Sequence, residues 1–145
     1  LVKDIRCGSC SGSRFYLTAV GNTLYFRAND GTNGYELWKS DGTASGTVMV
    51  KDICSGSCNS GPTYITPIGN TVYFRANDGT NGSELWKSDG TASGTVMVKD
   101  MNPGSVGSEI HYLTPVNNTI YFVLATDIDP IYGYINKGAL YSYIL

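Results

Sequence analysis

The strongest constraint on the fold is a tandem repeat. A segment of 48 residues occurs three times and accounts for nearly all of the 145-residue chain. The tripeptide Lys3-Asp4-Ile5 recurs as Lys51-Asp52-Ile53 and as Lys99-Asp100-Met101, each 48 positions after the last. Repeats of this length are typical of folds in which neighbouring units stack to bury a shared core. We therefore expect a single repeat domain with units at residues 1–47, 48–95 and 96–145.

Each unit is predicted to contain four short strands. Tyr, Thr and Val favour strands, while Gly, Asn and Asp favour the turns between them. No segment keeps a 3.6-residue apolar period, so we expect essentially no helix. In the second unit the expected strands are 64–68, 71–76, 83–87 and 95–100.

Apolar residues fall on both faces of the predicted second and fourth strands. Val72 and Phe74 alternate with Tyr73, and Val96 and Val98 alternate with Met97. This pattern indicates a sheet that is covered on both faces. Four antiparallel strands stacked on like neighbours describe a propeller blade, so we predict an all-β chain of three tandem four-stranded antiparallel β-propeller-like blades.

Two of the units carry a long shared motif. Residues 36–43 and 84–91 both read Glu-Leu-Trp-Lys-Ser-Asp-Gly-Thr, and each is followed, after Ala-Ser, by Gly-Thr-Val-Met-Val-Lys-Asp. These segments resemble the ELWxxDGT repeat family, which occurs in secreted and surface proteins, mainly bacterial. The resemblance implies propeller-like blades and an extracellular or cell-surface location. It implies no chemistry for particular residues, and the third unit lacks the motif.

One end of the chain has a predicted strand that the unit at the other end lacks. Residues 1–5 match the fourth strand of a unit, whereas the third unit supplies residues only as far as its third strand. We expect the N-terminal strand to complete the last blade, within the same chain or in a neighbouring subunit. The expected assembly strand is Leu1, Val2, Lys3, Asp4 and Ile5, and the expected acceptor strand is Ala139, Leu140, Tyr141, Ser142, Tyr143, Ile144 and Leu145.

Propellers usually have four to eight blades, which disfavours closure of three blades into a ring. A head-to-tail contact that does not close produces a filament, and a contact that closes produces a ring. A longer loop expected from Ala125 to Gly138 would cap the array or contact the next subunit. The alternative is that both ends are internal boundaries of a longer repeat protein. The absence of an initiating Met leads us to expect a removed leader or a mature portion.

These features predict an extracellular structural protein that assembles with itself through exchange of terminal β-strands, into a filament or an oligomeric ring. The alternative function is a carbohydrate-binding, lectin-like module that mediates adhesion. Trp38 and Trp86 would then be stacking platforms for glycans, whereas the structural interpretation places both in the blade core.

Four cysteines lie in two equivalent loops, at Cys7 and Cys10 and at Cys54 and Cys58. In a secreted repeat protein an even number of cysteines predicts disulfides, here Cys7–Cys10 and Cys54–Cys58. Pairing between the two loops is the next choice, and a zinc site of four thiolates is a further alternative.

The polar turns contain oxygen ligands of the kind that Ca²⁺ prefers. Each repeat turn has a single carboxylate, so a hydrogen-bonded Asx turn is the favoured interpretation and no cofactor is expected. The candidate ligands are Asn29, Asp30, Asn33, Asn77, Asp78, Asn81, Asp127 and Asp129. Asn81 and Asn117 also begin glycosylation sequons.

Other function classes find little support in the sequence. A net charge of −2 gives no electrostatic reason to expect nucleic acid, and no apolar run is long enough to span a bilayer. The one histidine, His111, has no counterpart in the other units. Glu36 and Glu84 recur beside Leu-Trp and are expected to bind a lysine or a backbone amide. We therefore expect no enzymatic activity.

Overall fold

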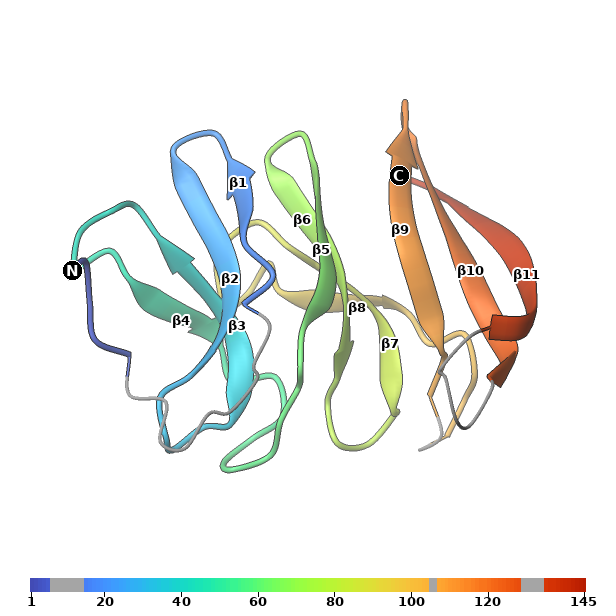
Figure 1. Ribbon diagram of the computed structural model, residues 1–145, viewed down its shortest axis with the longest axis horizontal. Helices are drawn as coiled ribbons and strands as arrows, with labels where there is room; N and C mark the ends of the chain where they lie inside the picture. Colours follow the sequence, from blue (N-terminus) through green and yellow to red (C-terminus); the bar gives the residue numbers. More distant parts are fainter. Residues whose placement is uncertain (6–14, 105–106, 129–134) are drawn as a thin grey trace.

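The computed structural model of the chain describes residues 1–5, 15–104, 107–128 and 135–145, and describes no side chains between residues 126 and 137. The described residues form three antiparallel sheets that lie side by side in chain order (Figure 1). No helix occurs among them, and hence none long and apolar enough to cross a membrane. The all-β prediction is confirmed.

Two sheets have four strands and one has three. The first sheet, in the order β1-β2-β3-β4, consists of β1 (Thr18–Val20), β2 (Thr23–Asn29), β3 (Tyr35–Ser40) and β4 (Val48–Lys51). The second, in the order β5-β6-β7-β8, consists of β5 (Thr63–Ile68), β6 (Thr71–Asn77), β7 (Ser83–Ser88) and β8 (Val96–Lys99). The third, in the order β11-β10-β9, consists of β9 (Ile110–Val116), β10 (Thr119–Ile128) and β11 (Ile135–Ile144).

The register shows how the third unit replaces the lost motif. Phe26 lies opposite Trp38 in the first sheet, and Phe74 lies opposite Trp86 in the second. In the third sheet Phe122 lies opposite Tyr141, so a tyrosine takes the tryptophan position. The two rings stack with their centroids 6.0 Å apart.

The long loop expected between Ala125 and Gly138 is wrong in its extent. β10 continues to Ile128 and β11 begins at Ile135, with Ala125 paired to Gly138. Pairing extends the hairpin because each added ladder residue satisfies backbone hydrogen bonds. Asp127 therefore lies in a strand, although its side chain is not described, and Asp129 lies outside the described residues.

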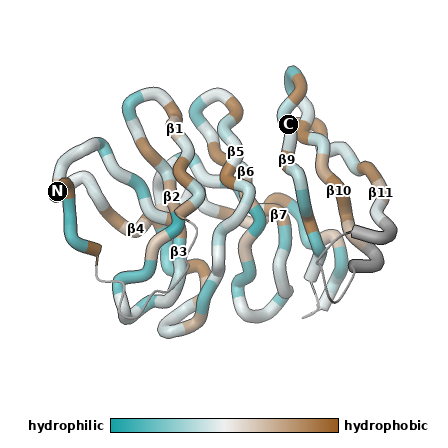
Figure 2. The backbone as a smooth tube through the Cα atoms, viewed as in Figure 1, coloured by the Kyte–Doolittle hydropathy of each residue, from teal (hydrophilic) through white to brown (hydrophobic). Residues whose placement is uncertain are grey.

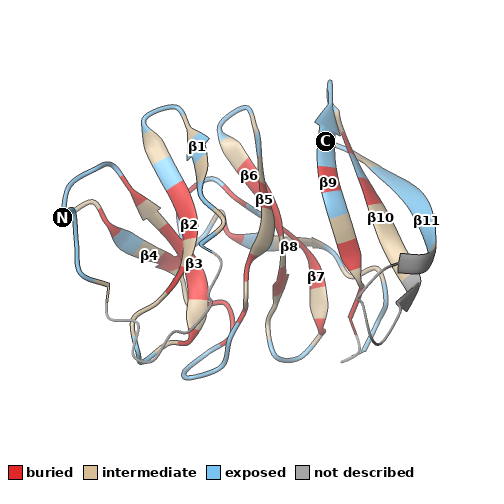
Figure 3. Cartoon of the chain, viewed as in Figure 1, coloured by how far each residue is buried: buried red, intermediate tan, exposed pale blue. Residues whose placement is uncertain are grey.

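Apolar residues fill the space between successive sheets. Between the first and second sheets, Tyr25 and Leu37 face Val72 and Phe74 in one cluster. Between the second and third sheets a like cluster forms from Tyr73, Leu85, Ile110, Leu113, Ile120 and Phe122. Figure 3 shows buried positions along β2, β3, β6, β7 and β10, and Figure 2 shows apolar positions interspersed with hydrophilic ones along the strands. The second sheet is covered on both faces, as the sequence pattern predicts.

The expected pairing of residues 1–5 with the third sheet of the same chain is wrong. These residues form no strand, and the third sheet holds only β9, β10 and β11 among the described residues. Figure 1 places the N-terminus beside the first sheet, at the opposite end of the row from β11. A strand requires a partner ladder, and no described strand of the same chain pairs with residues 1–5.

Candidate assembly site

The outer edge of the third sheet is β11. In the first two sheets the third strand pairs on its far side with a fourth strand, β4 or β8. β11 pairs only with β10 among the described strands, and its side chains at Leu140, Tyr141 and Ile144 are exposed. An unpaired strand edge of this kind presents a row of free N–H and C=O groups to another chain.

The N-terminal segment occupies a repeated position on the first sheet. Lys3 Nζ donates to the carbonyl of Thr47 at 2.7 Å. One repeat later, Lys51 Nζ donates to the carbonyl of Thr95 at 2.8 Å. Lys51 lies in β4, the fourth strand of the sheet that precedes its acceptor. Lys3 therefore contacts the first sheet as the fourth strand of a preceding unit would.

Ile5 supports the same equivalence. Its side chain packs against the cluster of Phe26, Ala28 and Trp38 on the outer face of the first sheet. Ile53, one repeat later, packs in the cluster between the first and second sheets. Sequence reasoning predicted residues 1–5 as a strand but missed that they stay docked on the first sheet. The 48-residue step from Lys51 and Ile53 is the signal that locates them.

After each four-stranded sheet, a buried carboxylate accepts hydrogen bonds from the segment that leads to the next sheet. Glu36 is fully buried and accepts hydrogen bonds from Ile53 N and Ser60 N at 3.0 Å and from Ser60 Oγ at 2.5 Å. These contacts hold the chain as it leaves β4 and approaches β5. Burial raises the pKa of the Glu36 carboxyl, and the three donors offset part of that rise. The predicted role as a partner of backbone amides is confirmed.

The second carboxylate is less well satisfied. Glu84 Oε2 accepts from Met101 N at 2.9 Å, whereas the buried Oε1 has no hydrogen bond of ordinary geometry. Burial raises the pKa of Glu84, and the nearby negative charge of Asp100 adds to the rise. In the third sheet Ala139 lies at the corresponding register, so this unit has no such carboxylate.

The Ser-Asp-Gly-Thr loops are compact turns. Asp41 Oδ1 accepts from Thr43 N at 2.9 Å and from Thr43 Oγ1 at 2.7 Å. Asp89 and Thr91 repeat both bonds in the second sheet. The threonine hydroxyls lower the pKa of both carboxyls. These exposed aspartates stabilise their own turns.

The turns that were candidates for Ca²⁺ use their oxygens internally. Asp30 Oδ1 accepts from the backbone N–H groups of Thr32 and Asn33, and Oδ2 accepts from Asn33 Nδ2. Asn29 Oδ1 accepts from Gly31 N. The donors, led by the Asn33 N–H, lower the pKa of Asp30. The second sheet repeats the same bonds at Asn77, Asp78 and Asn81. Both loops have the bonding of Asx turns.

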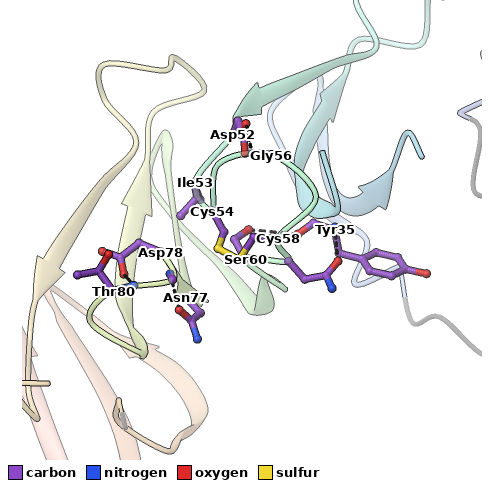
Figure 4. Close-up of a disulfide and its surroundings, with 12 residues drawn as sticks. Tyr35, Asp52, Ile53, Cys54, Gly56, Cys58, Ser60, Asn77, Asp78 and Thr80 are labelled. Atoms are coloured by element: carbon purple, nitrogen blue, oxygen red, sulfur yellow. Dashed lines mark hydrogen bonds between the residues drawn. A yellow bond between two sulfur atoms is a disulfide. The ribbon is translucent and has the colours of Figure 1, made fainter. Parts of the chain in front are cut away.

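A disulfide lies at the junction of the first two sheets. Cys54 and Cys58 are bonded in the connection between β4 and β5 (Figure 4). A Cβ on Gly79, in the turn between β6 and β7, would lie 2.9 Å from Cys54 Sγ. The disulfide therefore packs closely on the second sheet. The predicted Cys54–Cys58 pairing is confirmed, while Cys7 and Cys10 lie outside the described residues.

The remaining candidates do not form a reactive cluster. Trp38 and Trp86 are buried, so neither is an exposed platform for a sugar. His111 Nδ1 lies 2.9 Å from the hydroxyl of Tyr64, and burial lowers the pKa of His111. Among described residues, no three His, Cys, Asp or Glu side chains gather as metal ligands. Of the sequon residues, Asn81 is held by Asp78, while Asn117 is exposed at the turn between β9 and β10.

Comparisons with models of known protein families, with curated proteins and with solved structures found no match to this chain.

Proposed function

We propose that this protein is an extracellular structural protein that assembles with copies of itself by exchanging terminal β-strands. Residues 1–5 of one copy add to the free edge of β11 in the next and complete its third sheet. The product is a filament or a ring of copies joined head to tail. The resemblance to the ELWxxDGT repeat family and the disulfide both favour the extracellular location in this proposal.

The position of residues 1–5 carries the proposal. They contact the first sheet through Lys3 and Ile5 as Lys51 and Ile53 contact the second sheet. A unit docked in front of the first sheet would therefore find its fourth strand already in place. The third unit is the one that lacks such a strand among the described residues.

The register of the exchanged strand follows from the two complete sheets. Leu37 pairs with Lys51 in the first sheet, and Leu85 pairs with Lys99 in the second. Leu140 is the counterpart of Leu85, because both lie opposite the residue that follows the Phe of the second strand. Lys3 of one copy should therefore lie opposite Leu140 of the next. The added backbone bonds would cover an edge that is otherwise prone to aggregation.

Removal of residues 1–5 tests the proposal. The intact chain should sediment as particles much larger than a monomer, and the shortened chain should sediment as a monomer. A length-matched variant with residues 1–5 replaced by Gly and Ser should behave as the shortened chain does. Ala92→Arg, at an exposed loop of the second unit, is the control that should assemble normally. A monomeric intact chain, or unchanged particles after the deletion, would contradict strand exchange.

A further inference from the structure

The outer face of the first sheet is open where its counterparts are covered. Leu17 is 66% exposed, whereas its counterparts Ile65 and Leu113, at steps of 48 residues, are 7% and 8% exposed. Ile65 packs against the first sheet, and Leu113 packs against the second. Leu17 has no preceding sheet in the described chain. The exposed apolar side chains of this face are Phe15, Leu17 and Leu24.

The outer face of the third sheet is also exposed, at positions whose counterparts in the second sheet are buried against the next sheet. Tyr121 is 37% exposed, whereas its counterpart Tyr73, which packs toward the third sheet, is 8% exposed. Leu140 is 72% exposed, whereas Leu85 at the same register is fully buried. Tyr112 and Val116 extend the same exposed surface. The two ends of the row thus present the two halves of the interface that is repeated inside the chain.

The internal interfaces contain a hydrogen bond that repeats with the unit. Thr18 Oγ1 donates to the carbonyl of Ile65 at 2.8 Å between the first two sheets. Thr66 Oγ1 approaches the carbonyl of Leu113 at 3.3 Å between the next two. One further step gives the exposed Thr114, whose hydroxyl donates to the carbonyl of Tyr112 at 3.1 Å, as that of Thr66 donates to the carbonyl of Tyr64 at 2.8 Å. Its matching acceptor is the carbonyl of Leu17 in another copy.

A second internal contact has an open counterpart. A Cβ on Gly90 would collide with the hydroxyl oxygen of Tyr25, so that tyrosine lies directly on the turn of the next sheet. The corresponding Gly42 of the first sheet has no atom within 4 Å of the same position. Tyr121 is the counterpart of Tyr25 on the open face of the third sheet. Its hydroxyl can therefore contact the uncovered turn at Gly42 in a second copy.

We infer that these two faces bind each other between copies of this chain. The first-sheet face consists of Phe15, Leu17 and Leu24, and the third-sheet face consists of Tyr112, Val116, Tyr121 and Leu140. The inference rests on the proposed function and adds its second element, a face-to-face interface of fixed polarity. The Thr114 hydroxyl, which donates to the Tyr112 carbonyl of its own chain, approaches the Leu17 carbonyl as Thr66 approaches Leu113, and Tyr121 covers the Gly42 turn. Because each copy has one face of each kind, the contact is heterologous.

One internal bond is not reproduced in this interface. Lys39 Nζ donates to the carbonyl of Gly90 at 2.7 Å between the first two sheets. In the third sheet Ser142 lies at the lysine position, opposite Tyr121 as Lys39 lies opposite Tyr25. The contact between copies therefore relies on apolar burial, the repeated threonine contact and a tyrosine contact like that of Tyr25 with the Gly90 turn.

Two variants, each blocked at one face, test the inference. Leu17→Arg places a charge on the first-sheet face, and Leu140→Arg places one on the third-sheet face. Each variant keeps one intact face, so each should sediment as a monomer when alone. An equimolar mixture should form a heterodimer that does not grow further, because the intact face of each variant then meets the other. Heterodimer formation also shows that both variants are folded, and Ala92→Arg is the control.

The outcomes separate this inference from strand exchange. Assembly of Leu17→Arg or Leu140→Arg to normal particles, while deletion of residues 1–5 gives monomers, would overturn the face-to-face inference and leave strand exchange standing. Monomers in the mixture would also overturn it. Blocked variants that pair as predicted, with a deletion that has no effect, would support the faces and contradict strand exchange. A monomeric intact chain would contradict both.

Discussion

The second and third sheets derive from the same repeat, yet they end in different states. The second sheet has four strands, packs between two neighbours and has a complete core on each face. The third has three described strands, an open edge at β11 and an open face at Tyr121 and Leu140. The comparison teaches that a repeat of this kind is stabilised by its neighbours, so that the exposed surface of a unit without a described neighbour predicts what binds there.

The largest expected difference concerns Leu85 and Leu140, which occupy the same register. Leu85→Ala should lower the free energy of unfolding by about 2–5 kcal/mol, because it leaves a cavity at a fully buried site. Leu140→Ala should change it by less than about 0.5 kcal/mol in the monomer. Urea unfolding measures the change in the free energy of unfolding for each variant. Both are made in the Leu17→Arg background, which is expected to be monomeric. Equal losses would show that the outer face is not open.

The next difference lies between the two buried carboxylates. Glu36→Gln should lower the free energy of unfolding by about 2–3 kcal/mol, since an amide group would face three donors that now bind a carboxylate. Glu84→Gln should cost about 1 kcal/mol, because Met101 N donates to its carboxylate at 2.9 Å while the neighbouring Ser108 makes only a weaker contact with it. Thermal or urea unfolding compares the two. A larger loss at Glu84 would contradict the ranking.

The disulfide distinguishes the two internal junctions. Replacing Cys54 and Cys58 by Ser should lower the free energy of unfolding by about 2 kcal/mol, because the bond closes only a short loop. Hydrogen exchange should increase in the β4–β5 connection and in the turn at Gly79, which the disulfide contacts. Exchange in the connection between β8 and β9 serves as the internal control. An increase confined to that second connection would contradict the assignment.

The smallest expected effect is a dependence on pH. Burial raises the pKa of Glu84 above the ordinary value of 4.5, so the folded state binds the proton more tightly than the unfolded state. Stability contributed by this group is full below pH 4.5 and is lost as the pH rises through the folded pKa. The slope is at most about 1.4 kcal/mol per pH unit. Glu84→Gln should reduce the pH dependence of the free energy of unfolding, measured by urea titration above pH 4.5. An unchanged slope would show that the Glu84 carboxyl is not its source.

Much of the fold could be predicted from the sequence because the repeat makes local and long-range signals agree. The four strands of the second unit, the double-sided core and the Cys54–Cys58 bond all follow from residue types at fixed spacing. The extent of β10 and β11 could not be predicted, because polar residues such as Asp127 are compatible with either a loop or an exposed hairpin.

The site was harder to predict than the fold. The sequence identified residues 1–5 and 139–145 as unmatched strands, but not the position of the first of these. That position depends on tertiary contacts of Lys3 and Ile5 with the first sheet. The two open faces were also missed, since Leu17 and Ile65 look alike in sequence and differ only in whether a neighbouring sheet covers them.

A cryo-electron microscopy map of particles formed by the intact chain tests the central claim most directly. Our account predicts a four-stranded third sheet in each copy, with residues 1–5 of the next copy beside β11 and Lys3 opposite Leu140. It also predicts the Tyr121 ring over the Gly42 turn of that copy. A map in which β11 is bare, or in which copies meet through other surfaces, would contradict it.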